Sequence, residues 1–113
     1  MSDYVVSVAR MATDRPGRYA KQLVSHLSKN FQGAWSEEDG RGELNFAPGR
    51  AELVAEEDAL ALRIDVPADQ IDRFENVVGR HLVFFGKRDE LVVRWERADG
   101  TPGQVFGNDG GTE

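Results

Sequence analysis

The chain has 113 residues, of which 40% are hydrophobic, which is enough to bury one core without disulfides or a structural metal. It has no cysteine, which excludes disulfide frameworks, thiolate nucleophiles and zinc-thiolate sites. The net charge of −6 argues against nucleic acid as a partner, because that binding needs lysine and arginine to neutralise phosphates. No secretory signal and no apolar run of roughly 18 residues is present, so we expect no membrane span and a cytoplasmic location.

The first two predicted elements are a strand and an amphipathic helix. Residues 4–11 are rich in β-branched and aromatic types, which favours a strand. Thr13 or Asp14 can cap the helix that follows, and Pro16 is tolerated in a first turn because its missing N–H would have no partner there. We expect this helix to end at 28 or 29.

The side chains of this helix fall into three groups when they are placed at helical intervals. The apolar stripe that would pack on a sheet contains Ala20, Leu23, Val24, Leu27 and, by extension, Phe31. The opposite side carries Arg18, Lys21, Ser25 and Lys29. One edge between them carries Arg15, Tyr19, Gln22 and His26, which are surface neighbours at spacings of three and four.

From residue 33 to residue 66 the hydrophobic period changes from helical to alternating. Turn signals divide this stretch into four short strands, and the alternation predicts a sheet with one buried face and one solvated face. A second helix then opens at 67–70 with Asp69 as its cap, and it ends at Gly86. Its buried stripe contains Ile71, Phe74, Val78, Leu82 and Phe85, with His81 at the margin.

The last predicted strand covers residues 90–97. Residues 98–113 hold five of the twelve glycines and few apolar side chains, so we predict one domain over 1–97 and a disordered, Gly-rich tail over 98–113. The order β-α-β-β-β-β-α-β predicts an α+β, two-layer sandwich, in which a mainly antiparallel sheet of about six strands carries both helices on one face. The strand order does not follow from the sequence.

The basic charge is concentrated near the N-terminus. Residues 1–33 carry five bases against two acids, whereas residues 34–113 carry nine bases against eighteen acids. A solvated helix face explains this surplus, and a surface for a small anionic ligand is the functional alternative. The candidate ligand-binding residues are Arg15, Arg18, Tyr19, Lys21, Gln22, His26 and His81.

The two histidines are the only candidates for metal binding. His26 and His81 would approach each other if the two helices pack side by side, and imidazoles suit borderline metals. No His-x-x-x-His or Glu-x-x-His spacing supports such a site, so the sequence predicts no metal and no cofactor. Structural histidines that hydrogen-bond nearby groups are the favoured interpretation.

Five segments taken together resemble a known family. They are Thr-Asp-Arg-Pro-x-Arg-Tyr-x-Lys-Gln-Leu-x-Ser-His-Leu at 13–27, Trp35, the stretch from Ala51-Glu52-Leu53 to Leu62, Val78-x-x-His81-Leu82-x-x-Phe85, and Arg88-x-Glu90-Leu91 to Trp95. Over residues 5–96 this combination resembles the bacterial family called domain of unknown function 2218. The resemblance implies small stand-alone proteins, some of them joined to siderophore-interacting, flavin-dependent ferric-reductase domains, and so a cytoplasmic role near iron uptake without an established activity.

Three functional hypotheses follow. We favour a small non-enzymatic binding or accessory module, whose partner would be a small anionic ligand or an iron-siderophore. The second hypothesis is a small enzyme with His26 as its acid–base group, which requires a pocket containing His26, Tyr19 and Lys21. The third is an interaction domain that is either a monomer or a homodimer formed through the polar sheet face or an edge strand.

Overall fold

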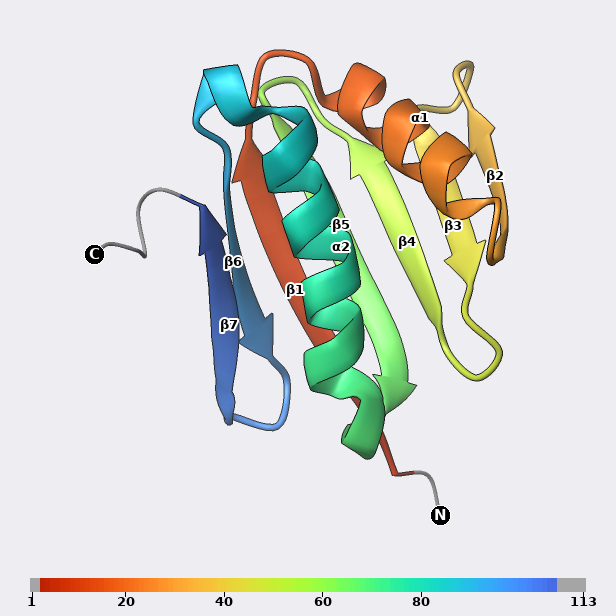
Figure 1. Cartoon of the computed structure of the whole chain (residues 1–113), viewed down its shortest axis with the longest axis vertical. Coiled ribbons are helices and arrows are strands. Elements are labelled where there is room, and N and C mark those ends of the chain that lie inside the picture. The colour runs from red at the N-terminus through yellow and green to blue at the C-terminus, as the bar shows by residue number, and fades with distance from the viewer. Residues whose placement is uncertain (1–2, 108–113) are drawn as a thin grey trace.

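A computed structural model describes residues 3–107 and shows one seven-stranded antiparallel sheet with both helices on one face. This confirms the predicted α+β architecture (Figure 1). The strand order is β2-β3-β4-β5-β1-β6-β7. The elements are β1 Tyr4–Ala12, α1 Pro16–Leu27, β2 Gln32–Ser36, β3 Arg41–Asn45, β4 Arg50–Ala55, β5 Ala59–Pro67, η1 Ala68–Gln70, α2 Ile71–Phe85, η2 Lys87–Asp89, β6 Val92–Arg97 and β7 Pro102–Gly107.

Strand β1 lies between β5 and β6, and α2 joins these two flanking strands (Figure 1). Along β1 the buried positions are Ser7, Ala9 and Met11, two of which have small side chains. On β5, Leu62 and Ile64 are buried while Arg63 is exposed, which confirms the predicted alternation. Alternate side chains of β1 and β5 therefore lie under the helices, because successive side chains of a strand point to opposite faces of the sheet.

The helices begin later than the sequence predicted. Arg15 is the N-cap residue of α1, and Thr13 instead accepts a hydrogen bond from the Arg15 backbone N–H at 3.0 Å. A short 3₁₀ turn precedes α2, so Gln70 takes the cap position expected for Asp69. Neither helix has a side-chain cap, because the polar side chains near both starts lie one or two residues too early. Gly86 ends α2 as predicted.

The prediction of a disordered tail from residue 98 is wrong for the part of it that forms β7. Residues 102–107 pair with β6 as an edge strand, and Phe106 packs against the core. Gly79 of α2 permits this contact, because a Cβ atom there would lie 2.6 Å from the Phe106 ring. Residues 108–113 of the predicted tail lie outside the described residues.

A buried network of hydrogen bonds connects β7 to α2, β1 and β6. The Glu75 side chain is fully buried and accepts hydrogen bonds from Ser7 Oγ at 2.7 Å and from Arg97 Nε and Nη2 at 3.0 and 2.9 Å. The backbone N–H and side-chain amide of Gln104 donate to the same carboxylate at 3.2 and 3.1 Å. Arg97 also pairs with Asp72. Strand β7 has few apolar side chains, and it is held to the fold because its polar groups complete this network.

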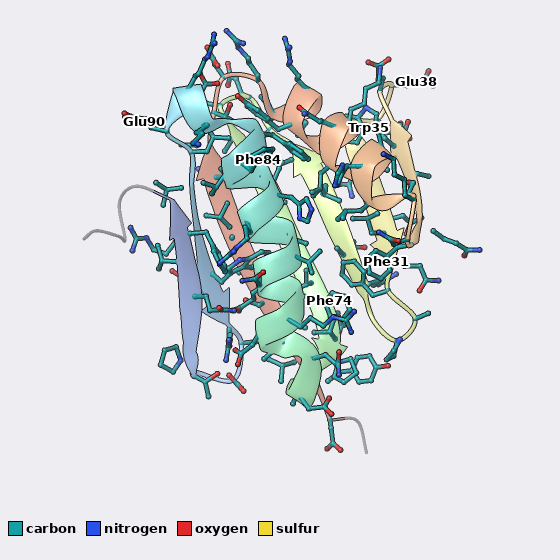
Figure 2. All side chains as sticks on the ribbon, viewed as in Figure 1. Phe31, Trp35, Glu38, Phe74, Phe84 and Glu90 are labelled. Atoms are coloured by element: carbon teal, nitrogen blue, oxygen red, sulfur yellow. The ribbon has the colours of Figure 1, made fainter. Side chains whose placement is uncertain are left out.

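Three aromatic rings pack together in the core near the start of α2. Phe46 and Phe74 are stacked with centroids 4.1 Å apart, and Phe31 meets Phe46 edge-on at 5.0 Å. In Figure 2, Phe31 and Phe74 lie lower in the view than Phe84. No helix among residues 3–107 is long and apolar enough to cross a membrane.

Candidate functional site

The two histidines meet in a cleft between α1 and α2. Their ring centroids are 4.9 Å apart with the planes tilted by 48°. The cleft has a volume of about 290 Å³ and a mainly apolar lining, formed by His26 of α1 and Arg80, His81, Phe84 and Phe85 of α2. We call these five residues the interhelical cleft.

The cleft follows from the amphipathic pattern of both helices. His26 sits beside the buried Leu23 and Leu27 positions, and His81 sits beside the buried Leu82. When both stripes pack on one sheet, the helix edges that bear the histidines are turned toward each other. Phe85 packs beside both rings, with centroid distances of 5.6 Å to His26 and 6.1 Å to His81.

The tautomer of the His81 ring follows from a contact within its own helix. Its Nδ1 lies 2.6 Å from the carbonyl oxygen of Val77, one turn earlier. A carbonyl can only accept, so Nδ1 carries the hydrogen and the neutral ring keeps its lone pair on Nε2. His81 is half-buried and His26 is exposed. The pair therefore combines an oriented imidazole with an accessible one.

Tyr19 does not reach the cleft and has a structural role. Its side chain is buried, and its hydroxyl donates to Asp89 Oδ2 at 2.5 Å. Burial and this hydrogen bond raise the pKa of the Tyr19 hydroxyl. Gly86 leaves space for the contact, since a Cβ atom there would lie 2.0 Å from Leu91 and 3.1 Å from the Tyr19 oxygen. Tyr19 thus joins the start of α1 to the turn that follows α2.

Replacing Tyr19 by phenylalanine tests this assignment. We expect the free energy of unfolding to fall by about 1 kcal/mol, because one hydrogen bond to an exposed carboxylate is lost while the ring stays buried. Urea denaturation measures the change. Ligand or metal titrations that follow the His26 and His81 resonances should be unaltered in Tyr19→Phe. Loss of binding at unchanged stability would contradict the structural role.

The remaining candidates of α1 lie away from the cleft. Arg18 and Lys21 line a separate cavity beside Trp35 and Glu37, where Lys21 Nζ is 3.8 Å from the Glu37 carboxylate. The Arg15 Nε atom lies 3.7 Å from the Asp14 carboxylate oxygen Oδ1. The side chain of Gln22 is exposed. The structure therefore divides the seven predicted ligand-binding residues: His26 and His81 share the interhelical cleft, whereas Arg18 and Lys21 share the cavity beside Glu37.

Sequence reasoning did not select Arg80, Phe84 or Phe85 as site residues. The sequence places Phe85 on the buried stripe, whereas in the structure it is half-buried and lines the cleft. Phe84 is 69% exposed near the C-terminal end of α2 (Figure 2). In the sequence, Phe84 could have been recognised as an aromatic residue that lies off the apolar stripe of its helix and next to Phe85.

Comparison with known proteins identifies the family. A family model described as "Uncharacterized protein conserved in bacteria (DUF2218)" matches residues 8–96. The chain belongs to this family. Among solved structures, this DUF2218 protein is similar to PA4090 from Pseudomonas aeruginosa, determined by NMR, with a TM-score of 0.68 and 25% sequence identity. The match covers 81% of this chain and 95% of PA4090. No curated protein matches the chain.

Proposed function

We propose that this DUF2218 protein is a small binding module that takes an aromatic anion in the interhelical cleft. The observation that carries the proposal is the cluster of four rings around an apolar cavity whose lining also includes Arg80. Phe84 and Phe85 offer ring surfaces to a planar ligand, and Arg80 offers a positive charge to its carboxylate or phenolate. The imidazoles add polar groups that orient the ligand.

The chemistry of the cleft, and not its size, supports this choice. A larger depression of about 600 Å³ lies near Gln32, Asn45 and Arg50, but it contains neither imidazole nor an aromatic cluster. The interhelical cleft is near the lower limit of ligand pockets, which run from about 300 to 1,000 Å³. We therefore expect a ligand of about ten non-hydrogen atoms and a dissociation constant between about 1 μM and 1 mM.

The acid–base enzyme hypothesis has less support. It requires His26, Tyr19 and Lys21 in one pocket. The Tyr19 hydroxyl is bonded to Asp89, and Lys21 lines the separate cavity beside Glu37. The geometry favours binding over catalysis.

The proposal is tested by titrating the protein with salicylate and 2,3-dihydroxybenzoate while recording the NMR signals of the two histidine rings. Benzyl alcohol, which is aromatic but uncharged, tests the contribution of the ring to binding. Cyclohexanecarboxylate, which is anionic but not aromatic, tests the contribution of the charge. A ferric catecholate siderophore is larger than the cleft and separately tests the iron-related role that the family resemblance implies. We expect both histidine signals to shift with the aromatic anions, and no shift with any of these probes would overturn the proposal.

Matched variants locate the binding site. Phe84→Ala and Arg80→Gln should each weaken binding about fivefold or more, because they remove the ring surface or the positive charge. Lys21→Gln removes a positive charge from the other cavity and should leave the affinity unchanged. A loss confined to Lys21→Gln would move the site to the basic side of α1.

A second copy of the chain is the alternative occupant of the cleft, since the exposed Phe84 ring could pack against another protein surface. We expect a monomer in light scattering at millimolar concentration. A dimer that dissociates in Phe84→Ala would replace the ligand-binding proposal with a role in self-association.

A further inference from the structure

We infer that His26 and His81 form a two-imidazole site for a borderline divalent metal such as Zn²⁺, Cu²⁺ or Ni²⁺, with open coordination positions facing the interhelical cleft. The metal part of this inference stands on the geometry of the two rings. The identity of the ligand at the open positions rests on the proposed function.

The distance between the rings matches a shared ion. Zinc–nitrogen bonds are about 2.0–2.1 Å long and the ring centre lies about 1.1 Å behind the nitrogen, so two imidazoles at a tetrahedral angle have centroids about 5 Å apart. The observed separation is 4.9 Å. The two ring centres are therefore at the separation that two imidazoles on one ion have.

The hydrogen bond at His81 prepares that ring for coordination. Because Nδ1 donates to the Val77 carbonyl, Nε2 holds the free lone pair and the ring is fixed in orientation. Metal-bound histidines in proteins have this arrangement, in which the nitrogen away from the metal is held by a carbonyl or carboxylate. His26 is exposed and is free to adjust its ring by rotation about its side-chain bonds.

The rest of the cleft supplies no further protein ligand. Among residues 3–107, no group of three histidine, cysteine or acidic side chains is placed to hold a metal ion. Two imidazoles then leave at least two positions of a tetrahedral ion for water or an added ligand. An aromatic anion with two neighbouring oxygens would fill both positions, and Arg80 would balance its remaining charge. Phe84 and Phe85 would cover the ring.

The test uses the full chain without a histidine tag, after treatment with EDTA and dialysis. Zinc chloride alone is titrated by calorimetry and by NMR, where the protein has only two histidine signals to follow. We expect one equivalent of Zn²⁺ to shift both. His26→Ala and His81→Ala should each reduce the affinity about tenfold or more, since half of the protein ligands are lost.

Controls keep the result interpretable. Ser25→Ala changes an exposed neighbour of His26 and should bind Zn²⁺ like the natural sequence. His26 is exposed, so His26→Ala should fold even if His81→Ala does not. The inference is overturned if neither ring signal moves, or if the double variant His26→Ala/His81→Ala binds Zn²⁺ equally well.

The two proposals fail separately. Salicylate or dihydroxybenzoate binding in EDTA, with no response to Zn²⁺ alone, would reject the metal site and retain the binding module. A response to Zn²⁺ alone, with no response to the aromatic anions in the presence of Zn²⁺, would retain the metal site and reject the proposed ligand class. We expect dihydroxybenzoate to bind at least about tenfold more tightly when Zn²⁺ is present, because it then gains bonds to the ion.

Discussion

Replacing Glu75 by alanine is expected to lower the free energy of unfolding by about 3 to 5 kcal/mol, which is a large share of the stability of a small domain. The carboxylate is fully buried and receives hydrogen bonds from Ser7, Arg97 and Gln104. Its removal leaves the Arg97 side chain, which is only 11% exposed, with Asp72 as its remaining acidic partner. Urea denaturation followed by circular dichroism measures the loss.

The substitution Glu75→Gln removes the negative charge and keeps the size of the side chain. It therefore tests how the stability contributed by the carboxylate depends on pH. Burial by itself would raise the pKa of Glu75, but the hydrogen bonds from Arg97, Ser7 and Gln104 outweigh it and hold the pKa below its ordinary value of 4.5. The ionised carboxylate therefore stabilises the fold above that value, and this contribution is lost as the pH falls through the lowered pKa.

The stability of the natural protein should thus decrease more steeply below pH 4.5 than that of Glu75→Gln, so that the two converge in acid. Denaturation series between pH 7 and pH 3 measure both curves. Parallel curves would show that the carboxylate is not held in its ionised form by the network.

Replacing Phe74 by alanine should cost about 3 to 5 kcal/mol, because it opens a cavity in the centre of the core. The ring is 2% exposed, is stacked on Phe46 and has the edge of Phe31 near it at 6.1 Å. Thermal and urea denaturation give the change.

Phe84→Ala is the matched control for this substitution, since it makes the same chemical change on the same helix at a position that is 69% exposed. We expect its effect on stability to stay within about 0.5 kcal/mol. A comparable loss in both variants would mean that Phe84 is held in a packed environment, and the interhelical cleft would then be closed to ligands.

Membership of the DUF2218 family and the fold shared with PA4090 leave the activity to be determined by experiment. Our proposals direct those experiments to the interhelical cleft. Of the residues that could bind an anion on α1, those on the basic side are engaged with Glu37 or open to solvent, whereas His26 meets His81 and two phenylalanine rings. Experiments on the two histidine signals therefore address both the ligand and the metal.

Much of the fold was predictable because its signals are local. Alternation on β5 and the stripe of α2 follow from which side chains avoid water, and neither requires knowledge of distant residues. Gly86 was recognisable as the end of α2 for the same reason. The cap residues were misplaced because a 3₁₀ turn and a bend shift the helix starts by one or two positions.

The number of helices, the buried faces and the place of each histidine beside a helix stripe follow from local patterns in the sequence. The strand order, the strand at 102–107 and the set of residues that share the cleft depend instead on tertiary packing. Glu75 and Gln104 are 29 residues apart and carry no local pattern, so their hydrogen bonds, and the strand they secure, depend on long-range packing. The meeting of His26 with His81 depends likewise on two helices lying side by side on one sheet.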